Sequence, residues 1–105
     1  MEYILRNIHF LELLAYPTSN EQASALLATS TAEQLNIISE FALNLLQDRI
    51  NLSRYYRSKL RKDAEVIRLL ADKEVGSKKR RNTAENNLNI ISLLLKVGLK
   101  HIRNG

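Results

Sequence analysis

Apolar residues recur at spacings of three and four along most of the chain, which predicts a series of amphipathic α-helices. Five such helices are expected, over residues 2–16, 18–28, 31–47, 54–71 and 78–103. Three Gly and one Pro leave few positions for the turns of a β-protein. We therefore expect an all-α fold, a compact bundle of four to five helices, in a single domain of residues 1–105.

Capping residues and one proline predict where these helices begin and end. Pro17 ends the first helix, because the residue before a proline disfavours helical backbone. Ser30–Glu33 has the sequence Ser-Thr-Ala-Glu, which predicts a capping box from Ser30 to Glu33. Thr18 or Ser19 is expected to cap the second helix, and Ser53 and Ser77 are expected to cap the last two. The segment 72–76 separates these two helices, which gives a basic two-helix hairpin.

The last predicted helix is apolar on nearly all sides between Ile90 and Val97. A helix of this kind is either the centre of a bundle or a contact surface. The second interpretation predicts a homo-oligomer formed through the last helix, with Leu93, Leu94, Leu95 and Val97 at the contact. In the preceding helix, Leu60 and Ile67 are expected to be buried.

Charge is distributed unevenly along the chain. Residues 49–81 contain twelve of the sixteen Lys and Arg with four acidic residues, a net charge of +8, whereas residues 1–48 have a net charge of −5. Clustered cations attract polyanions. We therefore predict that the partner is nucleic acid, DNA in the first place, bound through its phosphates without sequence preference. The charge pattern leaves the choice between DNA and RNA open.

Two groups of cations are the candidate nucleic-acid-binding residues. One group follows a helical spacing from Arg54 to Arg68, and the other is a run of four at the start of the last helix, where free N–H groups favour phosphate. The full set is Arg54, Arg57, Arg61, Lys62, Arg68, Lys78, Lys79, Arg80 and Arg81. The last three are expected to be exposed. A solvated basic face and a nuclear-localisation patch are the alternatives.

Aromatic residues accompany the first group of cations. Tyr55 and Tyr56 lie between Arg54 and Arg57, and aromatic rings among cations stack on unpaired bases. The apolar spacing places Tyr56 in the core. Tyr55 is therefore the ring expected to be accessible.

Residues 40–81 carry four short motifs in a fixed order. They are E-x-A-L-N-L-L from Glu40, I-x-L-S from Ile50, I-R-L-L-A-D-K from Ile67 and V-x-S-K-K-R-R from Val75. This order resembles small basic proteins encoded beside capsid genes in Polinton (Maverick) elements and related adintoviruses of animals. The resemblance implies a virus-like origin and proximity to nucleic acid. Residues 82–105 depart from it, because an amphipathic helix stands where the relatives have a glycine-containing apolar tail.

No catalytic motif is found in the sequence. It has no Cys, no Gly-rich phosphate loop and no HExxH motif, so we expect no enzyme, catalytic residue, cofactor, metal or small-molecule substrate. The apolar runs are too short to span a bilayer, so we expect no membrane partner and an intracellular location, nuclear or virion-associated. The alternative function is a helical protein–protein interaction module for an acidic partner or a second copy of the chain.

Overall fold

A computed structural model describes residues 2–50 and 52–104. Within these residues the chain is helical and contains no strand, which confirms the all-α prediction. Eight helices are found in this part of the chain, more and shorter than the four to five expected. They are α1 (Glu2–Leu5), α2 (Ile8–Ala15), α3 (Asn20–Ala28), α4 (Ala32–Leu46), α5 (Arg54–Arg61), α6 (Ala64–Ala71), α7 (Ser77–Glu85) and α8 (Leu88–Asn104).

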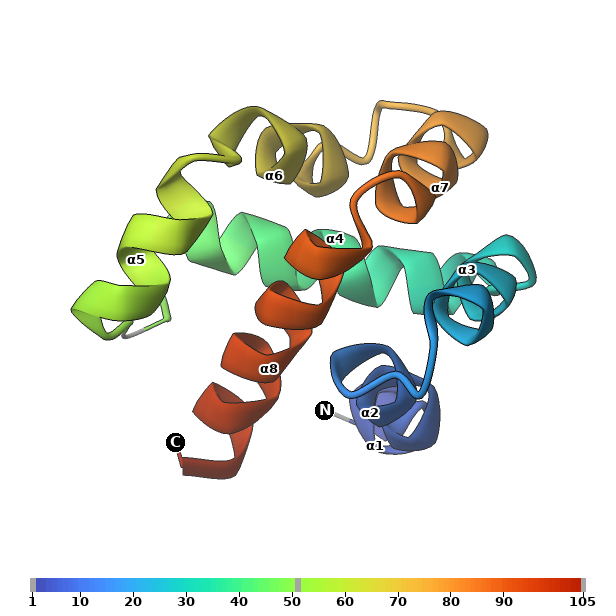
Figure 1. Cartoon of the computed structure of the whole chain (residues 1–105), viewed down its shortest axis with the longest axis horizontal. Coiled ribbons are helices and arrows are strands. Elements are labelled where there is room, and N and C mark those ends of the chain that lie inside the picture. The colour runs from blue at the N-terminus through green and yellow to red at the C-terminus, as the bar shows by residue number, and fades with distance from the viewer. Residues whose placement is uncertain (1, 51, 105) are drawn as a thin grey trace.

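α4 runs through the middle of the molecule, and α8 crosses it (Figure 1). α6 and α7 pack against α4, while α2 packs against α8. α4 buries residues on more than one face, namely Leu35, Ile37, Ile38, Ser39, Phe41 and Ala42. The two helices meet closely at Gly98, where an added Cβ would lie 2.7 Å from Cδ2 of Phe41. A side chain at position 98 would therefore push the two central helices apart.

The apolar faces of α8 are covered by other helices of the same chain. Leu94 and Leu95 are fully buried, and Val97 is 6% exposed. α2, α3, α4, α5 and α7 all contact this helix. The central position of α8 therefore accounts for its apolar pattern. Leu93 is only partly buried, and a homo-oligomer formed through this helix stays a prediction.

Three of the helices expected from the sequence are broken in two, and two of these breaks occur at an asparagine. Nδ2 of Asn7 donates to the carbonyl oxygen of Tyr3 at 2.7 Å, and Nδ2 of Asn87 donates to that of Thr83 at 2.8 Å. In each case the asparagine side chain donates a hydrogen bond to the carbonyl oxygen four residues earlier in the chain. The backbone N–H of the asparagine then donates to the carbonyl oxygen three residues earlier. Local side-chain bonds of this kind compete with the helix. They separate α1 from α2 and α7 from α8.

The third break separates α5 from α6 at Lys62 and Asp63. There the Asp63 N–H donates to the carbonyl oxygen of Leu60, three residues back, at 3.1 Å. The core positions on either side of this break are those expected, because Leu60 and Ile67 are 3% and 2% exposed. The break therefore changes the direction of the chain without changing which residues are buried.

The capping box of α4 lies one residue later than predicted. Thr31 Oγ1 accepts from the Gln34 N–H, and Gln34 Oε1 accepts from the Thr31 N–H. Ser30 is buried instead, and its hydroxyl donates to the carbonyl oxygen of Leu27. Glu33 receives hydrogen bonds from Arg6 and Asn7, at 2.6 and 2.8 Å for the closest contacts. The side chains of both residues of the predicted capping box therefore make other hydrogen bonds.

The remaining predicted caps have different outcomes. Ser19 and Ser53 accept hydrogen bonds at the starts of α3 and α5, as expected. Ser77 does not cap α7, because Gly76 occupies the capping position and Ser77 is the first helical residue. In the part of the chain that the structure describes, no helix has the length and apolar character needed to cross a bilayer.

Candidate nucleic-acid interface

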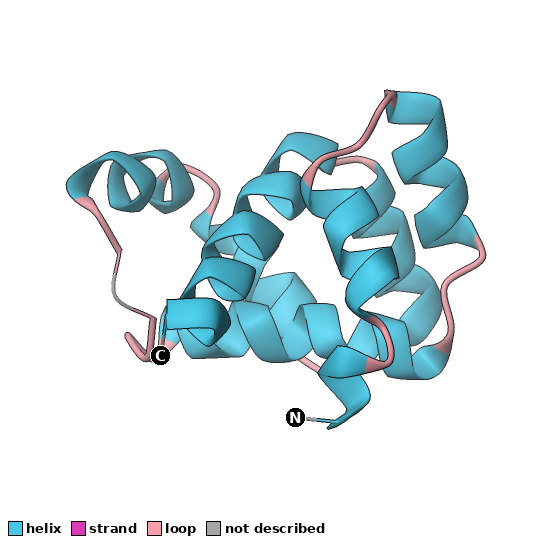
Figure 2. Ribbon diagram, turned by 90° about the horizontal axis from the view of Figure 1, so that it is seen from below, coloured by secondary structure: helices cyan, strands magenta, loops and turns pink. Residues whose placement is uncertain are grey.

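α5 is a short helix with one narrow apolar edge and a broad polar surface. Ser53 begins it, because its Oγ accepts a hydrogen bond from the Tyr56 N–H at 3.4 Å. Leu60 is the buried residue of this helix, and Tyr56, four positions earlier, is half-buried. Through this edge α5 packs against α8. Every other residue from Arg54 to Lys62 is exposed, and α5 lies at one edge of the molecule in both views (Figure 1, Figure 2).

Five cations lie on the exposed surface of α5 and at its end. They are Arg54, Arg57, Lys59, Arg61 and Lys62, and we call them the α5 cations. Among the described residues, none of them has a carboxylate oxygen within 4.0 Å. Lys59 instead places its Nζ 4.6 Å from the centroid of the Tyr55 ring, which is 59% exposed. α5 therefore combines positive charge that no nearby acid neutralises with an accessible aromatic ring.

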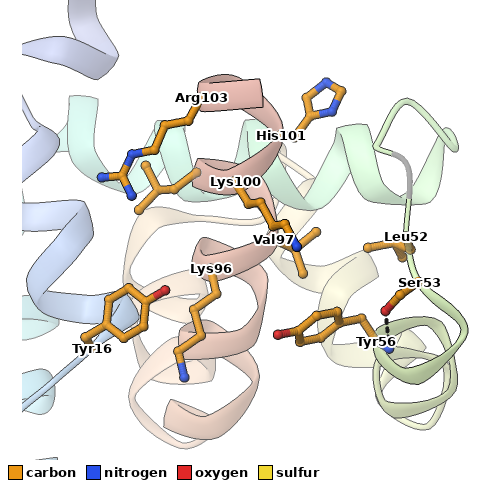
Figure 3. Close-up of a pocket in the computed structure, with 10 residues that line it drawn as sticks. Tyr16, Leu52, Ser53, Tyr56, Lys96, Val97, Lys100, His101 and Arg103 are labelled. Atoms are coloured by element: carbon orange, nitrogen blue, oxygen red, sulfur yellow. Dashed lines mark hydrogen bonds between the residues drawn. The ribbon is translucent and has the colours of Figure 1, made fainter. Parts of the chain in front are cut away.

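A cleft of about 560 Å³ lies between the start of α5 and the C-terminal half of α8 (Figure 3). Leu52, Ser53 and Tyr56 line it from the side of α5. From α8 it is lined by Val97 and Leu99 and by four basic residues, Lys96, Lys100, His101 and Arg103. None of the described residues that line this cleft is acidic. Positive charge therefore continues from α5 across the cleft onto α8.

Tyr16 completes the cleft from a third segment of the chain. Pro17 stops α2 after Ala15 and leaves Tyr16 at the helix end, 63% exposed. Two contacts hold this end of α2 against α8. Ser92 Oγ donates to the carbonyl oxygen of Ala15 at 2.6 Å, and Arg103 Nη2 lies 2.7 Å from Glu12 Oε1. As a result Lys96 Nζ lies 5.0 Å from the centroid of the Tyr16 ring.

Arg80, one of the predicted binding residues, is part of the core. It is 6% exposed, and it donates from Nε to the Val75 carbonyl oxygen at 2.9 Å. Its Nη1 donates to Ser39 Oγ at 2.8 Å and to Asn36 Oδ1 at 3.2 Å, so it joins α7 to α4. The expectation that Arg80 is exposed is wrong. Arg80 falls four residues before Ala84, on the apolar stripe of its helix, and this spacing was the signal for burial.

Arg81 is also engaged within the chain. It is half-buried, and its Nε and Nη2 donate to Oγ and the carbonyl oxygen of Ser30 at 3.2 and 3.1 Å. The expectation that Arg81 is exposed is therefore wrong as well. Lys78 and Lys79, in contrast, are exposed at the start of α7.

The structure does not bring the nine predicted residues together. Arg54, Arg57, Arg61 and Lys62 form one cluster on α5, and Arg68 is exposed on α6. Lys78 and Lys79 lie on α7, which is separated from α5 by α6 (Figure 1). Tyr16, Lys96 and Lys100 are residues that the sequence analysis missed. The position of Tyr16 before Pro17 and the four-residue spacing of the two lysines on α8 were the available signals.

Comparison with protein-family models, with curated proteins and with solved structures finds no match to this chain. The resemblance to Polinton and adintovirus proteins therefore stays a prediction.

Proposed function

We propose that this chain is a small nucleic-acid-associated protein that holds phosphate backbones without reading base sequence. The observation that carries the proposal is the set of α5 cations, five in nine consecutive positions, all exposed and without an acidic partner among the described residues. The virus-like origin implied by the sequence resemblance is part of the same proposal.

The density of charge on α5 suits a nucleic-acid backbone. Eight helical residues extend over roughly 12 Å, a length along which a duplex carries roughly seven phosphate charges. Each cation that meets a phosphate releases condensed counterions, which supplies most of the free energy of non-specific binding. Contacts to phosphate carry no sequence information. Binding through α5 would therefore be strong at low salt and insensitive to sequence.

The structure narrows the set of residues proposed to contact phosphate. Arg68, Lys78 and Lys79 are exposed and stay in it as flanking contacts. Arg80 and Arg81 are left out, because their guanidinium groups donate to acceptors within the chain. Lys73 also lies outside the set, because it forms an ion pair with Glu40.

The proposal is tested by the salt dependence of binding to short duplexes of unrelated sequence, followed by fluorescence anisotropy. If all five α5 cations meet phosphates, log affinity falls against log salt with a slope of about −4.5. The triple variant Arg54→Gln, Arg57→Gln, Arg61→Gln makes the slope shallower by about 2.7 and weakens binding to every duplex to a similar degree. A flat salt response, or equal affinity for polyglutamate, contradicts the proposal and favours an acidic protein as partner.

A further inference from the structure

The cleft between α5 and α8 is larger than contact with phosphates requires. We propose that it accepts an unpaired base, so that the protein prefers single-stranded nucleic acid to duplex. This inference rests on the proposed function and names its substrate class. Tyr16 and Tyr56 would hold the base, while Lys96, Lys100 and the α5 cations would hold the phosphates on either side of it.

The volume and the lining of the cleft suit an aromatic occupant. Its volume of about 560 Å³ lies within the range of about 300–1,000 Å³ typical of small-molecule sites. In Figure 3 the Tyr16 and Tyr56 side chains point toward one another from opposite sides of α8, with Lys96 between them. The remaining wall includes the apolar side chains of Leu52 and Val97. Aromatic rings and apolar walls provide stacking surfaces that any base can use.

The charge of the cleft indicates that the occupant is an anion. Lys96 and Lys100 line it, and in the described part of the chain no acidic residue does. Arg103, the further cation there, is paired with Glu12. Tyr16 remains 63% exposed although Lys96 Nζ lies 5.0 Å from its ring centroid. A cation beside an accessible ring is the arrangement by which proteins hold single strands, the ring stacking on the base and the cation meeting the backbone.

Single strands satisfy this arrangement better than duplexes. In a duplex both faces of each base are covered by its neighbours, so a base enters the cleft only after unstacking, which costs free energy. A duplex therefore binds through phosphate contacts alone, chiefly to the α5 cations. A single strand uses the same cations and adds the stacking of one base.

The test compares a single-stranded thymidine oligonucleotide with a blunt-ended two-strand duplex of the same number of phosphates, by fluorescence anisotropy at one salt concentration. Tyr16→Ala lowers affinity for the single strand by about fivefold to a hundredfold and leaves affinity for the duplex unchanged. Tyr16→Phe retains the stacking surface and restores binding. Tyr3→Ala is the matched control, because Tyr3 is also exposed but lies on α1, outside the cleft.

A second probe isolates the contribution of the base. An oligonucleotide of the same length with abasic sites keeps its phosphates but cannot stack on Tyr16 or Tyr56, so it should bind the parent protein no more tightly than the intact strand binds Tyr16→Ala. Tyr16→Ala should not weaken its binding further.

Each remaining outcome overturns a distinct claim. Equal affinity for single strand and duplex, with Tyr16→Ala without effect, overturns the cleft inference and leaves the α5 interface standing. Failure to bind either nucleic acid at low salt overturns both. In a third outcome, Tyr16→Ala binds a glutamate- and tyrosine-containing peptide more weakly than the parent does, while its binding to the single strand is unchanged. This result assigns the cleft to an acidic protein and overturns the inference.

Discussion

α5 and the start of α7 carry the two densest groups of cations in the chain, and the fold places them in opposite environments. α5 contacts α8 through one narrow edge, so its cations are exposed. α7 lies against α3, α4, α6 and α8, so Arg80 is buried and Arg81 is half-buried between these helices. Arg80 and Arg81 serve as hydrogen-bond donors to Ser39 and Ser30, while the α5 cations have no such partners among residues 2–50 and 52–104.

This difference shows that local charge density does not by itself identify a binding surface. A guanidinium group can satisfy several buried acceptors at once, and its aliphatic stem packs like an apolar side chain. Whether an arginine is exposed depends on how many helices surround its own. The four predictions that follow test this contrast between α5 and α7, in order of decreasing effect.

The largest effect is expected for Arg80→Ala. Loss of the guanidinium leaves Ser39, which is 1% exposed, and the Val75 carbonyl without their donor. We expect the free energy of unfolding to fall by about 3 kcal/mol, measured by urea denaturation. Lys79→Ala, one residue earlier and exposed, should change it by less than about 0.5 kcal/mol. Equal effects of the two substitutions would show that Arg80 is not a structural residue.

Leu60→Ala tests how α5 is attached. Leu60 is the buried residue of this helix, and its removal leaves a cavity facing α8. A loss of about 2–3 kcal/mol in unfolding free energy is expected, at the low end of the range for buried leucine because α5 has few neighbours. Ser58→Ala, exposed on the same helix, is the control and should have little effect. An unchanged stability in Leu60→Ala would mean that α5 does not pack against α8.

Arg81→Ala should have a smaller effect than Arg80→Ala, since Arg81 is only half-buried. Its two hydrogen bonds to Ser30 predict a loss of about 1 kcal/mol. A double-mutant cycle with Ser30→Ala, followed by urea denaturation, isolates the side-chain bond, and a coupling energy of about 0.5 kcal/mol or more is expected. Additive losses would show that the two side chains do not interact.

The smallest effect concerns Arg6, an exposed cation that, unlike those of α5, has an acidic partner. Hydrogen bonds from Arg6 and then from Asn7 lower the pKa of Glu33 from its ordinary value of 4.5 to about 2. Because the folded-state pKa is the lower one, the pair stabilises the fold above about pH 4.5, and this contribution disappears as the pH falls toward 2.

Glu33→Gln should therefore melt slightly below the parent at neutral pH, and the two curves should converge as the pH approaches 2. The difference is small because both side chains are exposed, and added salt should reduce it. Thermal melts across this pH range measure it. A difference between parent and variant that does not change with pH would contradict the assigned pKa.

The helical class, the core positions and several boundaries followed from local patterns. The spacing of Leu60 and Ile67 predicted that they are buried, which the structure confirms. Pro17, Ser19 and Ser53 predicted helix ends that the structure also confirms. These features depend on residues within one or two turns of each other, so the sequence displays them directly.

The features that could not be predicted depend on contacts between distant segments. Arg80 is separated from its acceptor Ser39 by 41 residues, and Glu33 from Arg6 by 27. The cleft draws Tyr16, Tyr56 and Lys96 from three segments whose arrangement no local pattern contains. The breaks at Asn7 and Asn87 are local, but each required its side chain to compete with the helix for one carbonyl oxygen.

The central claim is that the main contact with nucleic acid is made by α5, and that the exposed lysines of α7 contribute little to it. The most direct measurement compares two variants that each remove two exposed cations, Arg54→Gln with Arg57→Gln and Lys78→Gln with Lys79→Gln, binding the same single strand at low salt. The α5 variant should bind roughly tenfold or more weakly, and the α7 variant should stay within about threefold of the parent. A larger loss in the α7 variant, or equal losses in both, would contradict the claim.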